Sequence, residues 1–157
     1  MTELILTILV DAFWSAIAAA GFAMLFNVPR RTLIACALTG AAGHAVRALL
    51  MHFGMNIIPA TLAGATVIGF VAEYCAHRWR APALLFTVSA AIPMVPGSFA
   101  YRAMLGVIRI TTATAEPGTP ILVDAGINFI TTGLILAALA LGIAMPQLLF
   151  RRRRLFS

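Results

Sequence analysis

The feature that most constrains this chain is a series of long apolar stretches, each separated from the next by a short segment with charge, proline or glycine. A helix of about 20 residues crosses the roughly 30 Å hydrocarbon core of a bilayer, and the stretches have about this length. The sequence therefore predicts an all-α polytopic membrane protein with a single transmembrane domain over residues 1–157. We expect about five transmembrane helices, near residues 4–26, 32–51, 57–76, 83–108 and 121–150.

The composition excludes an ordinary soluble domain. Of the 157 residues, 62% are hydrophobic and 10% are charged, and the mean hydropathy is +1.00. A formal net charge of +6 also occurs in nucleic-acid-binding proteins, but here the 11 basic residues are all arginines, placed mainly at the ends of apolar stretches. Charge at such positions orients helices in a membrane. We therefore expect contact with membrane lipid and no nucleic-acid partner.

The arginines also predict an orientation in the bacterial inner membrane, because basic residues near helix ends prefer the cytoplasmic side. With five spans, Arg109 is the one arginine in the loops on one side. The loops and tail on the other side contain Arg30, Arg31, Arg78, Arg80, Arg151, Arg152, Arg153 and Arg154. The N-terminus is therefore expected outside the cytoplasm and the C-terminus inside it.

The fourth apolar stretch is interrupted. Pro93 and Pro96 each lack a backbone N–H and push the preceding residue out of the helical conformation, so a helix that begins near Ala83 should end or kink here. Gly97 and Ser98 allow a restart, with Ser98 as the N-cap and unpaired amides in the next turn. Discontinuous helices of this kind form substrate sites in transporters. The alternative is a proline kink that only shapes the packing.

Placing an ionisable residue inside an apolar stretch costs free energy unless its side chain is paired or hydrated. Each such residue is therefore a candidate for function. Arg102 follows the break and Arg47 lies in the second stretch. Two guanidinium groups and a helix N-terminus favour a small carboxylate, since Arg binds carboxylates through two parallel hydrogen bonds. The predicted substrate site consists of Gly97, Ser98, Tyr101, Arg102, Arg47 and Asn128. The alternative for Arg47 is that its side chain snorkels to the membrane surface.

His44 lies three residues before Arg47 and shares its helix face. Imidazole changes its charge near neutral pH, which makes His44 a candidate for proton coupling. The alternative is a buried histidine with a structural role.

Nothing in the sequence points to catalysis, to a metal or to a cofactor. The chain has no cluster of metal ligands, no nucleotide-binding loop and no paired carboxylates beside a soluble cleft. Cys36 and Cys75 each stand alone in an apolar stretch, as small packing residues do. A carrier without a nucleotide site moves its substrate down a gradient, couples it to an ion or relies on a partner.

Several motifs together resemble the threonine/serine exporter family, almost from end to end of the chain. They are Gly21–Arg31 with Phe-Asn-Val-Pro, Gly40 and Gly43-His44 with Arg47, Ile92–Ser98 with Pro-Met-x-Pro-Gly, Tyr101, Met104 and Asn128. The chain is similar to the short YjjB-type subunits of this family. The resemblance implies an inner-membrane secondary exporter that is incomplete alone and forms an oligomeric complex with a YjjP-type companion membrane subunit.

The resemblance implies succinate as the substrate of the two-subunit members, and threonine and serine as substrates of fused relatives. The arginines in the spans favour a succinate-like dicarboxylate over an amino acid, which needs one anion site and one ammonium site. Two other classes remain open. One is a non-transporting scaffold or regulatory subunit whose break docks a partner helix, and the other is a channel.

Overall fold

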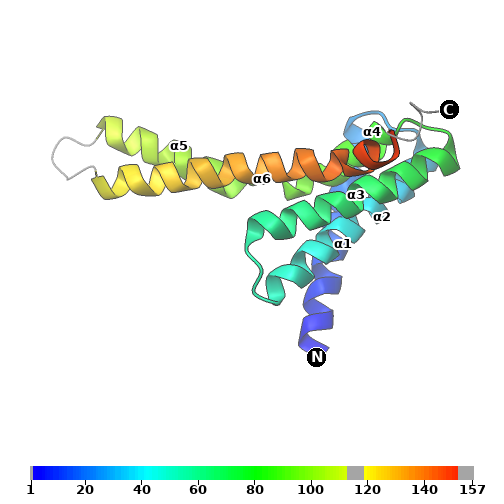
Figure 1. Cartoon of the computed structure of the whole chain (residues 1–157), viewed down its shortest axis with the longest axis horizontal. Coiled ribbons are helices and arrows are strands. Elements are labelled where there is room, and N and C mark those ends of the chain that lie inside the picture. The colour runs from blue at the N-terminus through cyan, green and yellow to red at the C-terminus, as the bar shows by residue number, and fades with distance from the viewer. Residues whose placement is uncertain (1, 113–118, 152–157) are drawn as a thin grey trace. The chain divides into compact units, whose positions relative to one another are not determined.

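The computed structural model describes residues 2–112 and 119–151, and within them every regular element is a helix (Figure 1). The elements are α1 (Thr2–Leu25), η1 (Arg30–Thr32), α2 (Leu33–His52), α3 (Ile57–Trp79), α4 (Ala83–Ala91), η2 (Ile92–Met94), α5 (Gly97–Thr112) and α6 (Thr119–Arg151). This confirms the predicted all-α fold class.

In the described residues, four helices are long and apolar enough to cross a membrane. They cover Glu3–Leu25, Arg30–His52, Ile57–Trp79 and Pro120–Leu149. The pair Ala83–Met94 and Gly97–Thr111 passes the same test when both halves are taken as one interrupted span, which brings the total to five. The observed helices therefore agree with the prediction of about five spans, the fourth of which is broken.

The predicted break in the fourth span is confirmed. The α-helical hydrogen bonding of α4 ends at Ala91, a short 3₁₀ helix follows through Met94, and α5 begins at Gly97. Proline explains why the α-helix is interrupted here, since neither Pro93 nor Pro96 can donate a backbone hydrogen bond. Ser98 is the second residue of α5 and not its N-cap, so that detail of the prediction is wrong.

Both ends of the predicted linker from residue 109 to residue 120 are helical in the structure, and residues 113–118 lie outside the described residues. Arg109 belongs to α5, which continues to Thr112, and α6 already begins at Thr119. The prediction ended the fourth span where the apolar stretch ends, and the helix itself continues beyond that point. The helix of the fifth span, α6, has 33 residues with Pro146 inside it, which is longer than one crossing needs.

The ends of the helices follow local chemistry. Asn56 is the N-cap of α3, and its side-chain oxygen accepts a hydrogen bond from the amide of Ile58 at 3.2 Å. Arg80 ends the same helix in the left-handed conformation, with φ 50°. Asn27 has φ 55° directly after α1, where Asn is one of the few residues that accept positive φ readily. These turns are as short as the sequence predicted.

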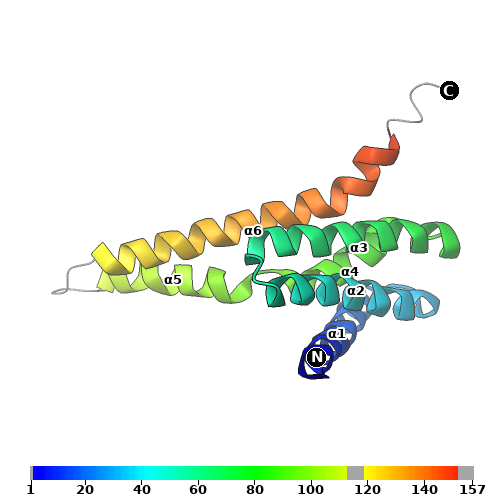
Figure 2. The ribbon, with the colours of Figure 1, turned by 60° about the horizontal axis from the view of Figure 1, so that its bottom comes forward.

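The chain forms two compact units, residues 1–94 with 138–157 and residues 95–137. In the first unit α1, α2, α3 and α4 pack against one another, and Figures 1 and 2 both show α2 beside α3. Small residues make this packing close. A Cβ atom added to Gly64 of α3 would lie 2.6 Å from the carbonyl oxygen of Gly43 of α2 and 2.9 Å from Cε of Met94. In the second unit, α5 lies beside the first half of α6.

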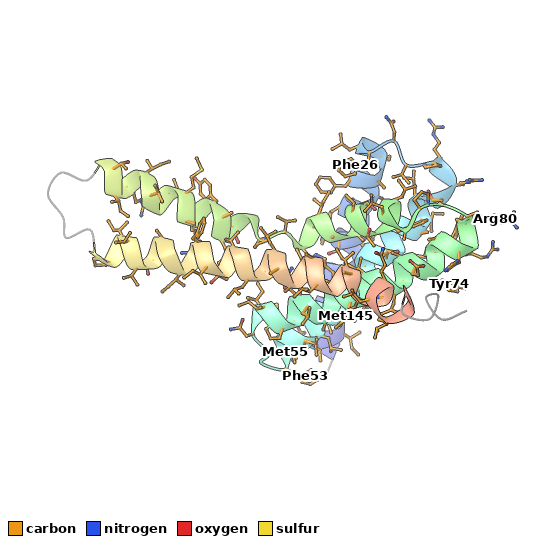
Figure 3. All side chains as sticks on the ribbon, turned by 45° about the horizontal axis from the view of Figure 1, so that its top comes forward. Phe26, Phe53, Met55, Tyr74, Arg80 and Met145 are labelled. Atoms are coloured by element: carbon orange, nitrogen blue, oxygen red, sulfur yellow. The ribbon has the colours of Figure 1, made fainter. Side chains whose placement is uncertain are left out.

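Large apolar side chains cover the outside of the first unit, as a membrane protein requires. Trp14, Ile34 and Leu84 are all exposed on the helices of this unit. Figure 3 shows Phe26, Phe53 and Tyr74 as further exposed side chains of the same unit. The buried positions hold mainly small residues, and Phe86 and Ile68 are the largest fully buried side chains. The apolar surface therefore faces lipid or partner helices.

We expect Gly64→Ala to destabilise the fold, because the new methyl group would meet the backbone of Gly43. Overpacking of this kind costs about 1–3 kcal/mol. Gly21→Ala is the matched control, since nothing lies within 4 Å of a Cβ atom at Gly21 and Ala is the better helix former. Thermal unfolding in detergent measures both effects. Equal unfolding temperatures for the two variants would contradict the close contact of α2 and α3.

Candidate functional site

The first unit contains an ionisable pair that joins α1 to α2. Nδ1 of His44 lies 3.1 Å from Oδ2 of Asp11, a distance at which the ring N–H donates to the carboxylate. The side chain of His44 is 12% exposed and that of Asp11 is 44% exposed. The histidine is therefore deep in the helix bundle, and its carboxylate partner lies nearer the surface of this unit.

Arg47 lies one turn beyond His44 and contacts the break. One of its guanidinium nitrogens donates to the backbone carbonyl of Met94 at 3.3 Å. The last carbonyls of a helix have no intrahelical donor, and a cation at this end also interacts favourably with the helix dipole. Arg47 thus caps the end of η2 from a neighbouring helix. Neither alternative for Arg47, substrate contact or snorkelling, anticipated this structural contact.

A polar cavity of about 430 Å³ lies in the second unit between α5 and the first half of α6. Its charged and amide side chains come from both helices. Arg102 and Arg109 belong to α5, and Asp124 and Asn128 belong to α6. The remaining lining residues are Leu105, Gly106, Ile121 and Ala125.

Helix periodicity explains why these side chains meet. Arg102 and Arg109 are seven residues apart, close to two turns, and Asp124 and Asn128 are four residues apart, so each pair shares one helix face. Gly106 lets the two helices approach closely, because a Cβ atom there would lie 2.5 Å from Cβ of Ala125. The close approach brings the polar faces of both helices to one cavity.

The cavity combines donors and acceptors. The guanidinium groups of Arg102 and Arg109 carry ten N–H donors between them by the chemistry of arginine, in forks that match a carboxylate. The Asp124 carboxylate accepts hydrogen bonds and binds cations. The amide nitrogen of Asn128 donates to the backbone oxygen of Asp124 at 2.7 Å, which leaves the amide oxygen of Asn128 as an acceptor. The arrangement can bind a small molecule that carries a carboxylate together with a donor group.

The predicted site residues are distributed over both units. Arg102 and Asn128 come together in the polar cavity. Gly97, Ser98 and Tyr101 are exposed in the first turns of α5 and do not line it. Arg47 and His44 belong to the first unit, as does Pro93, while Pro96 is buried at the start of the second unit.

The sequence alone did not place Arg109 and Asp124 in the polar cavity, and it did not place Asp11 beside His44. Arg109 was assigned to a loop, although its spacing of seven from Arg102 is a helical signal. Asp11 and Asp124 are both ionisable residues within predicted spans, and the sequence made each of them only a weak candidate. The pairing of Asp11 with His44 depends on how α1 packs against α2.

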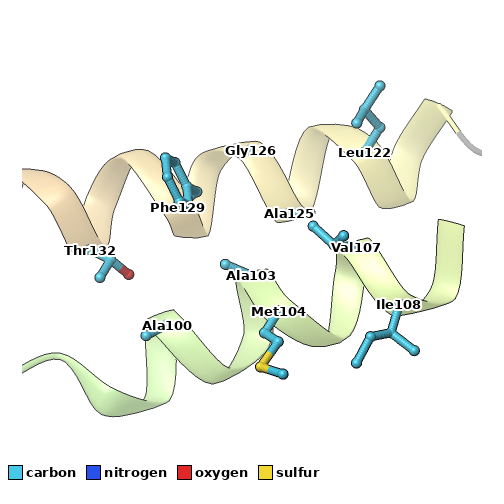
Figure 4. A pocket seen from close by; sticks show the side chains of 10 residues that line it. All are labelled: Ala100, Ala103, Met104, Val107, Ile108, Leu122, Ala125, Gly126, Phe129 and Thr132. Carbon is cyan, nitrogen blue, oxygen red and sulfur yellow. The ribbon is translucent and has the colours of Figure 1, made fainter. Parts of the chain in front are cut away.

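A second cavity of about 610 Å³ on the same two helices is apolar (Figure 4). Phe129 and Leu122 of α6 and Met104, Val107 and Ile108 of α5 contribute its large side chains. Thr132 supplies a single hydroxyl group. A carboxylate would lose its hydration here without gaining a charged partner, so the smaller polar cavity is the better candidate for recognition.

No group of three or more His, Cys, Asp or Glu side chains with metal-binding geometry occurs in residues 2–112 and 119–151. Cys36 and Cys75 are both buried free thiols of the first unit, packed in one cluster with Phe86 and Ala72. Their position matches the packing role predicted for them.

Comparisons with known proteins identify a family that this chain matches. A family model described as "Threonine/Serine exporter, ThrE" matches residues 11–149. An uncharacterized protein of Haemophilus influenzae is 40% identical over 159 aligned residues, which cover 98% of this chain and 51% of that relative. The chain therefore spans about half the length of this curated relative. No solved structure matches the chain.

We expect Arg47→Gln to lower the stability of the fold by about 2 kcal/mol, because the shorter amide leaves the Met94 carbonyl without its charged donor. Arg31→Gln is the matched control, since Arg31 is exposed in η1. Unfolding in detergent measures both variants. Unchanged stability of Arg47→Gln, together with weaker substrate binding, would instead restore the substrate-contact hypothesis for Arg47.

Proposed function

Because the chain belongs to the threonine/serine exporter family, we propose that it is one membrane subunit of a secondary exporter for small carboxylates. The polar cavity between α5 and α6 binds the substrate. Arg102 and Arg109 hold its carboxylate, and Asn128 and Asp124 bind its donor groups. The observation that carries this proposal is the presence of two guanidinium groups, a carboxylate and an amide in one cavity.

The lining favours an amino acid such as threonine or serine as the substrate. An amino acid brings one carboxylate to the arginines and one ammonium group to Asp124, and a side-chain hydroxyl suits the amide oxygen of Asn128. A dicarboxylate would bring its second carboxylate near Asp124, and like charges repel at close range. The match to the threonine/serine exporter family supports the same choice.

A succinate-like dicarboxylate is the second candidate. Arg102 and Arg109 are about two helical turns apart along α5, or roughly 10 Å at 1.5 Å per residue, so each can take one carboxylate. This arrangement suits a substrate with an anionic group at each end. The charge of Asp124 is what separates the two candidates.

A companion subunit completes the exporter. The relative from Haemophilus influenzae is about twice as long as the region it shares with this chain. We propose a YjjP-type membrane protein as this companion, and the two assemble into an oligomeric complex. The exposed apolar side chains on the described helices offer surface for that assembly as well as for lipid.

His44 is the proton-coupling residue of this exporter. The chain resides in the inner membrane with its N-terminus outside and its C-terminus in the cytoplasm, and the arginines at the span ends support this orientation.

We expect Arg102→Gln to reduce efflux of labelled substrate by tenfold or more at limiting concentration, since a lost charged hydrogen bond costs about 1.5–3 kcal/mol. The assay uses cells that express the chain with its companion, at matched membrane abundance, and Arg31→Gln as the control. Undiminished efflux in Arg102→Gln would favour the scaffold alternative. Efflux that responds to no gradient except that of the substrate would favour a channel.

Asp124→Asn separates the two substrate candidates. We expect it to reduce efflux of threonine and serine by about tenfold, because the ammonium group loses its anionic partner, and to leave or raise efflux of succinate. The measurement compares the three labelled substrates in one strain. A loss confined to succinate would reverse the substrate assignment.

A reporter enzyme that is active only outside the cytoplasm tests the orientation. Fused to the C-terminus, it should be inactive, and fused after Gly54, in the turn between α2 and α3, it should be active. The reverse pattern would contradict the predicted topology.

A further inference from the structure

We propose that Asp11 and His44 form one proton-binding site, in which Asp11 is the positioning residue that fixes the imidazole, and that Arg47 links this site to the broken helix at Met94. This inference rests on the proposed function for its role in transport. Its geometry stands independently, because all four residues lie in the first compact unit.

The contact with Asp11 selects one form of the imidazole ring. Oδ2 of Asp11 accepts the hydrogen bond, so the neutral ring carries its proton on Nδ1. The other nitrogen, Nε2, is buried and has no hydrogen-bond partner among the described residues. A second proton therefore adds to Nε2, and the resulting imidazolium remains paired with the Asp11 carboxylate. No other bond forms or breaks in this step.

The charges around His44 are few. Asp11 faces it from α1, and Arg47 of its own helix interacts electrostatically with the same carboxylate. On α3, Gly64 and Ile68 lie beside Gly43, the residue before His44, and neither of them carries a charge. The described residues of α4 and η2 contain no titratable side chain. The cluster is thus formally neutral before His44 is protonated and carries one positive charge afterwards.

The added positive charge affects the break through its electrostatic interaction with the Asp11–Arg47 pair. Before protonation, the Asp11 carboxylate accepts a hydrogen bond from the neutral ring and attracts the Arg47 guanidinium. After protonation, the imidazolium competes with Arg47 for the same carboxylate, because both are cations near one anion. Arg47 is also the donor to the Met94 carbonyl, the last residue of η2. Proton binding at His44 therefore changes the electrostatic environment of the group that caps the broken helix.

The chain contains a second histidine–carboxylate pair that serves as an internal control. Nε2 of His77 lies 3.3 Å from Oε1 of Glu73 on α3, but the side chain of His77 is 72% exposed. Water can replace Glu73 as a partner of His77, whereas His44 is enclosed by the bundle. The two pairs have the same chemistry and differ in burial and in their connection to the break.

The first test measures the tautomer of the His44 ring directly. Nitrogen NMR of histidine-labelled exporter, assembled with its companion in lipid, distinguishes the two neutral tautomers, and His44→Gln assigns the signal. We expect the Nδ1–H form in the wild type and in Asp11→Asn, whose amide oxygen still accepts the hydrogen bond. Asp11→Ala should lose this preference, and Glu73→Ala should leave the His44 signal unchanged. An Nε2–H form in the wild type, or a signal indifferent to Asp11→Ala, would overturn the proposal.

The second test measures how a proton gradient changes the rate of substrate efflux. A proton gradient should stimulate efflux by the wild type and by Glu73→Ala. The stimulation should disappear in His44→Gln and in Asp11→Asn, while exchange of labelled for unlabelled substrate continues in both. Retained stimulation in His44→Gln would refute the role in coupling. Absence of any exchange in the wild type would refute the proposed function, and the tautomer would still decide whether Asp11 and His44 form the site.

Discussion

A helix that is interrupted inside hydrocarbon must satisfy its free backbone groups with protein, and the rest of this structure depends on how the chain does so between Met94 and Gly97. Pro93 and Pro96 remove two backbone donors. The Met94 carbonyl is paired with Arg47 from α2, and the amide of Gly97 turns back to the carbonyl of Val95 at 2.8 Å. Gly64 leaves the room that Arg47 and Met94 need. Met94, the last residue of η2, is thus part of the packed first unit.

The break also lies at a boundary between the two compact units, and each unit holds one of the two polar clusters proposed to function in transport. The cluster of the first unit pairs a largely enclosed histidine with a carboxylate that lies nearer the surface. The cluster of the second unit lines a cavity with two guanidinium groups, a carboxylate and an amide. Enclosed groups suit proton binding, and open groups suit a substrate. In the function proposed above, α1 and α2 supply the coupling site, and α5 and α6 supply the substrate site.

The fold was largely predictable from the sequence, because apolar length and charged turns are strong signals in membrane proteins. The break followed from Pro93 and Pro96 in the same way. The sites were only partly predictable. Arg102 and Asn128 share a cavity because Gly106 lets α5 and α6 approach, and His44 meets Asp11 because α1 packs on α2. Both depend on pairings between helices, which the spacing along one helix does not contain.

The central claim, that substrate binds in the polar cavity between α5 and α6, is tested most directly by substrate protection of a cysteine. Leu105→Cys places a thiol in the lining of the polar cavity, and Met104→Cys places one in the apolar cavity on the same helices. The native Cys36 and Cys75 are buried in the first unit. Threonine, serine or succinate should slow labelling of Leu105→Cys and leave Met104→Cys unaffected. Equal labelling of Leu105→Cys with and without substrate would contradict the assigned site.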